Sequence, residues 1–215
     1  MDRRALSLLL VAVVALAGVV NATVFAYRWI QGTVDISGPG AATGAACTGF
    51  YSSADQSGIG LPSAGTNYNA PTYGTNTITV THGDTVCEWT AGSTTYRLYE
   101  SIAVTIPVTV GSWYIQDFYG FGYKGDASDP TVYVYFRVDQ AVSGPLSEAY
   151  LRIWKGTSLV AELDLKTSGA TTSAITLLPG EALRLDLSLD ASSEGTATFK
   201  VGVYVTQESG EAPSP

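Results

Sequence analysis

The side chains that most often perform acid–base or metal chemistry are scarce in this sequence. His82 is the only histidine, so a cluster of imidazole metal ligands is excluded. Histidine is also the most frequent general base in enzymes, and only this one is available for that role. The sequence contains no G-x-S-x-G elbow, no H-E-x-x-H motif and no P-loop. Because His82 lies in the segment T-H-G-D-T, we expect a solvent-exposed turn residue rather than a functional one.

Paired carboxylates are the remaining catalytic possibility, because glycoside hydrolysis needs two of them beside one bond. Most of the candidates fall on outward-facing positions of expected strands, where they would simply solubilise a sheet face. In the loop K-G-D-A-S-D-P, Asp126 and Asp129 offer the oxygen ligands that calcium prefers, and calcium at this loop stays an open question. We therefore expect no enzyme, no catalytic residue, no cofactor and no assigned metal. The carboxylate candidates are Glu88, Glu100, Asp117, Asp139, Glu162 and Asp164.

A dense run of aromatic residues suggests carbohydrate binding as another class of function. Rings that share one exposed face form a platform for sugars, but here both parities of the expected strand are aromatic. That pattern favours packing at a sheet edge or at a subunit contact. A carbohydrate-binding or glycosidase-like β-sandwich remains an alternative function. The run consists of Trp113, Tyr114, Phe118, Tyr119, Phe121 and Tyr123.

The two cysteines, Cys47 and Cys87, form an isolated pair. Behind a secretion signal such a pair predicts one disulfide, because secreted proteins fold in an oxidising compartment. Closing a loop of this length should remove unfolded-state entropy worth roughly 4 kcal/mol in the chain-entropy treatment. Two buried free thiols are the alternative.

The composition is that of an all-β extracellular domain rather than a cytosolic enzyme. The chain of 215 residues is 46% hydrophobic but only 14% charged, and Gly and Tyr contribute 23 and 13 residues. With a net charge of -8 there is no basic surface to release counterions from phosphates, which excludes nucleic acid as a partner. The lysines are scattered, which also argues against an anionic membrane surface.

Alternating apolar and polar residues predict short strands along the rest of the chain. Ile102, Val104, Ile106 and Val108 give the clearest case, and Pro107 suggests an edge or a bulge there. We predict an all-β, two-sheet jelly-roll β-sandwich over residues 37–207, without a helix after residue 36. Within it, residues 37–76 form a Gly/Ser/Asn-rich loop insert that the disulfide holds on the surface, and residues 208–215 form a flexible tail. The expected strands are 77–81, 85–89, 96–110, 113–121, 132–138, 149–154, 159–166, 174–178, 183–189 and 197–205.

The N-terminal residues 1–22 have the features of a signal peptide. Two arginines precede an apolar run that ends in V-N-A, so we expect signal peptidase to cut after Ala22 and leave Thr23 as the new N-terminus. A cut after Ala26 is also possible. Under a competing interpretation the cut falls before Leu6 and the apolar stretch is retained as a helix; an uncleaved membrane anchor is a third possibility.

The functional hypothesis rests on residues 23–36, TVFAYRWIQGTVDI. Their apolar residues occupy both parities, and a strand that is apolar on both faces must be covered on both sides. Gly32 suggests a bend, followed by a half-buried strand. Our hypothesis is that this segment leaves its own globule and completes the sheet of a neighbouring subunit as a donor strand. The donor-strand residues are Val24, Phe25, Ala26, Tyr27, Trp29, Ile30, Val34 and Ile36.

Two regions of the sequence resemble a known family. The signal followed by F-A-Y-R-W-I-Q-G-T-V-D-I looks like the start of TasA-like and camelysin-like matrix fibre proteins. The segments W-Y-I-Q-D-F-Y-G-F, V-Y-V-Y-F-R-V, L-P-G-E-A-L-R-L-D-L-S-L-D and G-T-A-T-F-K-V-G-V-Y-V are similar to archaeal bundling pilins of that group. The resemblance covers most of the chain outside residues 37–76. Separately, Arg4-Ala5-Leu6-Ser7 before the apolar run looks like the start of an archaeal type IV prepilin.

The first resemblance implies a secreted jelly-roll subunit that polymerises by donor-strand complementation into extracellular pili that bundle in a biofilm or mediate cell–cell adhesion. Its partners would be identical subunits, joined head to tail, and neighbouring filaments at lateral contacts. Contact with a membrane would occur only through the signal segment before cleavage. The second resemblance implies the alternative, a type IV pilin with a retained N-terminal helix.

Overall fold

The computed structural model describes residues 30–37 and 47–213 of the 215-residue chain. Every regular element in these two ranges is a β-strand, which confirms the all-β prediction. Within the same ranges, no helix is long and apolar enough to cross a membrane. The signal segment 1–22 and the cleavage positions Ala22, Ala26 and Leu6 lie outside the described residues.

The described strands are short to medium in length and follow one another closely along the chain. They are β1 Ile30–Ser37, β2 Cys47–Tyr51, β3 Pro71–Tyr73, β4 Asn76–Thr77, β5 Thr79–His82, β6 Thr85–Ala91, β7 Thr94–Tyr99, β8 Ser101–Val108, β9 Gly111–Lys124, β10 Val132–Ser143, β11 Leu146–Lys155, β12 Ser158–Asp164, β13 Ile175–Leu177, β14 Ala182–Ala191 and β15 Gly195–Thr206.

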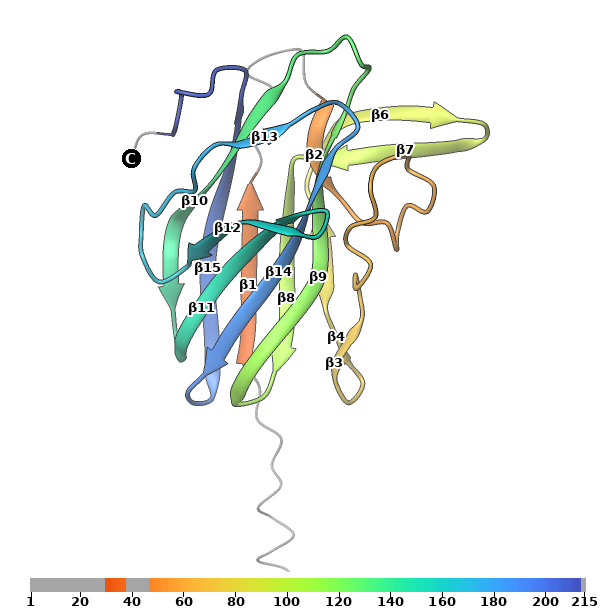
Figure 1. Cartoon of the computed structure of the whole chain (residues 1–215). Helices are drawn as coiled ribbons and strands as arrows, with labels where there is room; N and C mark the ends of the chain where they lie inside the picture. The colour runs from red at the N-terminus through yellow and green to blue at the C-terminus, as the bar shows by residue number, and fades with distance from the viewer. Residues whose placement is uncertain (1–29, 38–46, 214–215) are drawn as a thin grey trace, which may run out of the picture.

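Two large sheets form the body of the molecule (Figure 1). The six-stranded sheet has the order β13-β10-β15-β1-β8-β5, and the seven-stranded sheet has the order β12-β11-β14-β9-β2-β7-β6. A small two-stranded sheet, β3-β4, lies at one side, and the β6–β7 hairpin projects from the body (Figure 1). This arrangement is that of a β-sandwich.

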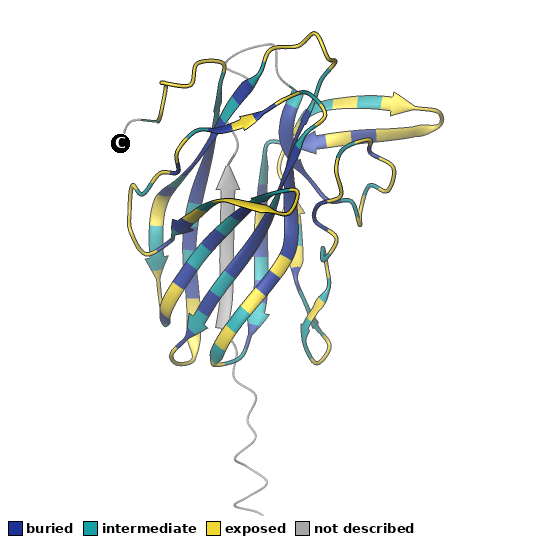
Figure 2. Ribbon diagram, viewed as in Figure 1, coloured by how far each residue is buried: buried dark blue, intermediate teal, exposed yellow. Residues whose placement is uncertain are grey.

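The core lies between the two sheets, where Figure 2 shows buried residues alternating with exposed ones along the strands. In β8, Ile102, Val104, Ile106 and Val108 are buried, as their alternation predicted. The prediction of one continuous strand over 96–110 is wrong, because the chain passes from one sheet to the other at Glu100. Tyr96 and Leu98 of β7 instead pack in a second, smaller core.

This smaller core explains why part of the 37–76 insert is not loop. The structure places β2 inside it, and Phe50 and Tyr51 are fully buried. Phe50 packs between the sheets, whereas Tyr51 joins a cluster outside the seven-stranded sheet under the following loop. Within the described part of the insert, β2, β3 and the first residue of β4 are in strands, whereas residues 52–70 contain no strand. The smaller core consists of Tyr51, Ile59, Ala64, Tyr96, Leu98 and Ala182.

Two glycines of β9 allow the 52–70 loop to approach the sheet. A Cβ at Gly120 would lie 2.7 Å from the Ala64 Cβ, and one at Gly122 would lie 2.7 Å from Leu61 Cδ1 and 2.9 Å from the Tyr51 ring. Side chains at these positions would push the loop off the sheet. Together with Gly125 they match G-x-G-x-x-G by pattern, but here the pattern lies within and just after a strand, with no helix following it, so it forms no dinucleotide loop.

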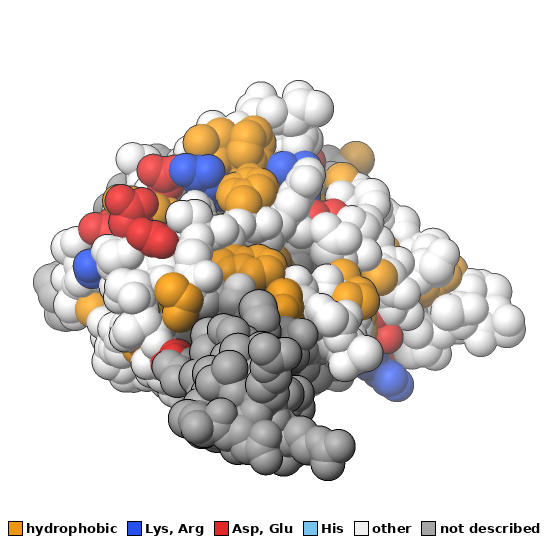
Figure 3. Space-filling model, turned by 90° about the horizontal axis from the view of Figure 1, so that it is seen from below, with side chains coloured by type: hydrophobic (Ala, Val, Ile, Leu, Met, Phe, Trp, Pro, Cys, Tyr) orange, Lys and Arg blue, Asp and Glu red, His pale blue; other side chains and the backbone are white. Residues whose placement is uncertain are grey.

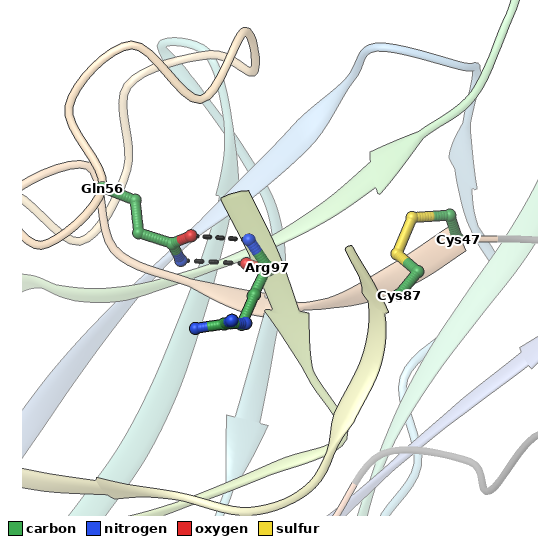
Figure 4. The surroundings of a disulfide bond; sticks show 4 residues. All are labelled: Cys47, Gln56, Cys87 and Arg97. Carbon is green, nitrogen blue, oxygen red and sulfur yellow. Dashed lines mark hydrogen bonds between the residues drawn. A yellow bond between two sulfur atoms is a disulfide. The ribbon is translucent and has the colours of Figure 1, made fainter. Parts of the chain in front are cut away.

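The predicted disulfide is present. Cys47 of β2 is bonded to Cys87 of β6 (Figure 4). Beside it, the Gln56 side chain accepts a hydrogen bond from the Arg97 N–H at 2.7 Å and donates one to the Arg97 carbonyl at 2.9 Å (Figure 4). The disulfide and these two hydrogen bonds connect the projecting β6–β7 hairpin to β2 and to the 52–70 loop.

Candidate polymerisation groove

Strand β1 occupies the centre of the six-stranded sheet. It pairs in parallel with β15 over Ile30–Ser37 and antiparallel with β8 over the same eight residues. The remaining pairs of this sheet are β13–β10, β10–β15 and β8–β5. Strand β1 is therefore the only strand, among the described residues, that joins the β13-β10-β15 half of the sheet to the β8-β5 half. We call the space between β8 and β15 the β1 slot.

The walls of the β1 slot are apolar on the side that faces the core. Val34 is the Cα partner of Val104 in β8 and of Phe199 in β15. The pairing continues through Gly32 without a register shift, so the predicted bend at this glycine is wrong. The core-facing residues of the two walls are Ile102, Val104, Ile106, Val108, Ala197, Phe199, Val201 and Val203, all buried.

Part of the predicted donor strand lies within the described residues. Ile30, Val34 and Ile36 lie in β1. Val24, Phe25, Ala26, Tyr27 and Trp29, and the predicted junction between Ala22 and Thr23, lie outside the described residues. The slot thus accounts for eight residues of paired strand, Ile30–Ser37.

The link between β1 and the body is long compared with the strand itself. Residues 38–46 separate Ser37 from Cys47, and those ten peptide steps extend to about 33–36 Å. An eight-residue strand is about 26 Å long. The covalent connection therefore reaches further than the strand that it carries.

One of the predicted surface carboxylates is buried. Asp117 is only 7% exposed and has a φ of 54°, an uncommon conformation for a residue other than glycine. Its carboxylate accepts hydrogen bonds from the Gly65 N–H at 2.6 Å, from the Thr66 N–H at 3.2 Å and from the Thr66 hydroxyl. Asp117 therefore anchors the 52–70 loop and does not solubilise the sheet.

A second buried carboxylate was missed by sequence reasoning. Asp186 is fully buried, and it accepts hydrogen bonds from the Asp117 N–H at 2.7 Å and the Tyr114 hydroxyl at 2.5 Å. The Arg184 Nε lies 3.2 Å from its Oδ1. Burial, followed by the hydrogen bond to Asp186, raises the pKa of Tyr114. The only sequence signal was that Arg184 and Asp186 share one face of an expected strand.

The aromatic run does not form one exposed platform. Phe118, Tyr119, Phe121 and Tyr123 are fully buried in the main core, and only Tyr114 is well exposed, at 47%. Ile115, Tyr119, Phe121 and Tyr123 share one parity and all belong to the main core. Phe118, of the other parity, lies in the stretch between the two registers of the β9–β14 pair, where Leu185 pairs with Tyr119 and Leu187 with Ile115. The sequence expectation of packing, rather than of a carbohydrate platform, fits this arrangement.

Several of the other candidate carboxylates take part in ion pairs or hydrogen bonds. Glu88 is ion-paired with Arg97 and Glu162 with Arg152, both on the surface. In the 126–129 loop, the Asp129 carboxylate accepts a hydrogen bond from the Asp126 N–H at 2.7 Å. Within residues 30–37 and 47–213, no group of three or more His, Cys, Asp or Glu side chains is arranged to hold a metal ion.

His82 is not the exposed turn residue that the sequence predicted. It ends β5, its ring is stacked on Tyr99 with 4.1 Å between centroids, and its Nε2 lies 2.6 Å from the Tyr119 hydroxyl. Tyr68 stacks against it at 6.0 Å. Since β5 belongs to one sheet and Tyr99 and Tyr119 to the other, His82 joins the two sheets along this side of the sandwich.

This environment predicts a loss of stability in mild acid. Burial lowers the pKa of His82, and the charge of Asp55 opposes that shift in part. A lowered pKa means that the folded state prefers the neutral ring, so this contribution is present above the unfolded pKa of about 6.5 and is lost as pH falls through the lower folded value. Urea titrations between about pH 8 and 5 should show it, and His82→Phe, which keeps a ring for stacking, should show a smaller decline. Equal declines in both proteins would contradict the role of His82.

No protein-family description matches the chain, and no curated protein shows significant similarity to it.

Proposed function

We propose that this protein is the subunit of an extracellular filament, in which β1 of one subunit occupies the β1 slot of the next. The observation that supports this most directly is the position of β1. A strand that is central in a sheet, close to one end of the chain and tied to the body by a long link can be supplied by another copy without changing the rest of the fold.

The dimensions of the link agree with this proposal. For β1 to fill the slot of a neighbour stacked end to end, its connection must span about the length of one strand, and the reach of residues 38–46 exceeds that length. The contact is head to tail, so it generates a filament when the rotation between successive subunits does not close into a ring. An empty slot exposes two strand edges and an apolar wall, which favours occupation by a partner.

The surface suits lateral association into bundles and a role in biofilm or cell–cell adhesion. Only 14% of the residues are charged. The end of the sandwich that carries the β8–β9 and β14–β15 turns, which a neighbour stacked end to end would face, also displays mainly uncharged atoms, with separate hydrophobic groups and acidic groups gathered on one side (Figure 3). Low charge reduces the repulsion between parallel filaments of the same composition. Secretion, cleavage after Ala22 and extracellular localisation belong to the same proposal.

A cysteine pair across the slot tests the exchange of β1. Thr33 is the Cα partner of Thr105, so Thr33→Cys combined with Thr105→Cys should form a disulfide under mild oxidation. In filaments this bond would join different chains, and non-reducing electrophoresis should show a ladder of covalent multimers. The single variant Thr33→Cys is the control and should give no ladder. Filaments whose pair forms bonds only within single chains would contradict the proposal.

A further inference from the structure

Part of β9 has a strand partner on one side only. Residues 111–115 pair with β14, but β2 pairs with β9 only over residues 120–124. Between these regions the Asn67 side chain covers the edge, because its Nδ2 donates to the Gln116 carbonyl at 2.6 Å. Alternate residues of an antiparallel strand turn their backbone groups to opposite sides. Part of the backbone of Ser112–Ile115 therefore points away from β14, and no described strand pairs with it.

A groove of about 330 Å³ runs along this unpaired edge. Its volume lies at the lower end of the range for small-ligand sites, roughly 300–1,000 Å³. One wall is Trp113–Gln116 of β9, the opposite wall is the chain around Ala70–Thr72, and the buried Ile78 contributes apolar surface between them. The described lining contains no residue of β1, β8 or β15, so the groove is separate from the β1 slot.

The groove is uncharged. Its described lining contains no Asp, Glu, Lys or Arg, although the chain carries 11 basic and 19 acidic side chains. A charged ligand would lose hydration here without gaining an opposite charge in the lining. The groove therefore fits a neutral ligand.

Two aromatic rings border the groove and are held in place by hydrogen bonds. Trp113 is half-buried, and its Nε1 donates to the Thr109 carbonyl at 2.8 Å. Tyr114 is 47% exposed, and its hydroxyl donates to Asp186 at 2.5 Å. Rings fixed in this way lose little conformational freedom when a ligand packs on them. The C–H face of a sugar ring is a neutral apolar surface that can stack on such rings.

Hydrogen-bonding groups for sugar hydroxyls lie at the same edge. The Gln116 side chain is exposed and lines the groove, and its amide has no hydrogen-bond partner among the described residues. That amide offers donors and an acceptor, and the outward N–H and C=O groups of Ser112–Ile115 add more of both kinds. A hydroxyl also donates and accepts, so it matches this set of groups.

The shortness of the edge favours a sugar over a peptide. Asn67 ends the unpaired edge at Gln116, which leaves only Ser112–Ile115, and only alternate residues of that run turn their backbone groups outward. Strand addition by a peptide depends on a row of main-chain hydrogen bonds. A small ligand needs only a few positioned polar groups beside apolar surface.

We propose that this groove binds a neutral oligosaccharide. Its sugar rings stack against Trp113 and Tyr114, and its hydroxyls bond to the Gln116 amide and to the free backbone groups of β9. The site does not depend on the proposed exchange of β1, because none of its described lining belongs to that strand. In a filament the site would recur in every subunit, and engagement of several sites at once can raise the overall affinity by about 10²–10⁴.

Calorimetric titration of the secreted protein with cellohexaose, maltohexaose and mannohexaose tests the proposal. We expect at least one of these neutral probes to bind with a Kd of about 1 mM or tighter. Gln116→Ala should weaken that binding about three- to tenfold, the loss expected for one hydrogen bond. The matched control is Gln140→Ala, which replaces an exposed glutamine of β10 in the other sheet and should leave the affinity unchanged. No binding of any probe, or equal affinities of the two variants, would overturn the proposal.

Hydrogen exchange locates the bound probe and distinguishes a sugar site from a peptide site. The bound sugar should slow exchange at Ser112–Ile115, while Leu159 and Val160, on the exposed edge strand β12, stay unchanged. Trp113→Ala should abolish this protection, whereas Trp154→Ala, at a half-buried position of β11, should retain it. Protection of the edge by the alternating peptide VTVTV, but by none of the sugars, would overturn the proposal in favour of strand addition.

Discussion

Deletion of residues 23–37 should abolish filament formation and leave a subunit that is monomeric or aggregates. The deletion separates the two halves of the six-stranded sheet and uncovers the wall that includes Val104 and Phe199. Each buried apolar side chain that becomes exposed costs about 1.5–3 kcal/mol, so several together are comparable with the whole stability of a domain. Electron microscopy and sedimentation of the secreted protein measure the result.

Rescue by a peptide separates loss of assembly from loss of folding. A synthetic peptide with the sequence of β1, IQGTVDIS, should bind the deletion variant and suppress its aggregation. The matched control carries Val34→Asp, which places a charge at the register position between Val104 and Phe199, and it should not bind because an unpaired charge is costly to bury. Intact filaments formed by the deletion variant would refute the role of β1.

Replacement of Asp186 by alanine should lower the free energy of unfolding by about 3–5 kcal/mol, the range for breaking a buried ion pair. The substitution leaves the Asp117 N–H and the Tyr114 hydroxyl without their acceptor and Arg184 without its carboxylate. Because Asp117 in turn holds Gly65 and Thr66, we also expect faster proteolysis within the 52–70 loop. Urea unfolding of the monomer and limited proteolysis measure the two effects.

Asp190 provides the matched comparison on the same strand. It is half-buried and accepts hydrogen bonds from the side chains of Ser147 at 2.7 Å and Ser112 at 3.3 Å near the surface. Asp190→Ala should cost less than about 1 kcal/mol. If the two alanine variants lose a similar free energy of unfolding, the buried network around Asp186 does not stabilise the fold as proposed.

Strand periodicity predicted most of the fold, because alternation in sequence reports directly on which face is buried. Ile102 to Val108 and the alternating leucines of β14 are buried as expected. The disulfide also followed from composition and the expected compartment. Strand order did not follow, since periodicity within a strand carries no information about its neighbours; the placement of β1 between β8 and β15 required the structure.

The residues that sequence reasoning misjudged are polar residues whose partners are distant in sequence. His82 contacts Tyr119 and Tyr99, and Asp117 holds residues about fifty positions away. The residues next to them in the sequence do not indicate such contacts. Strand β2, with its two buried aromatic residues, was not predicted as a strand because it is only five residues long and lies in a stretch dominated by Gly, Ser and Asn.

The pairing of β1 with strands on both sides determines how a fibre of these subunits would respond to tension. If β1 links successive subunits, a pull along the fibre acts parallel to the strand, and its hydrogen bonds to β8 and β15 are loaded together in shear. Bonds loaded in this way must break nearly at once rather than one after another, so rupture is governed by a high barrier to unfolding. The same strand that determines assembly would then give the fibre its tensile strength.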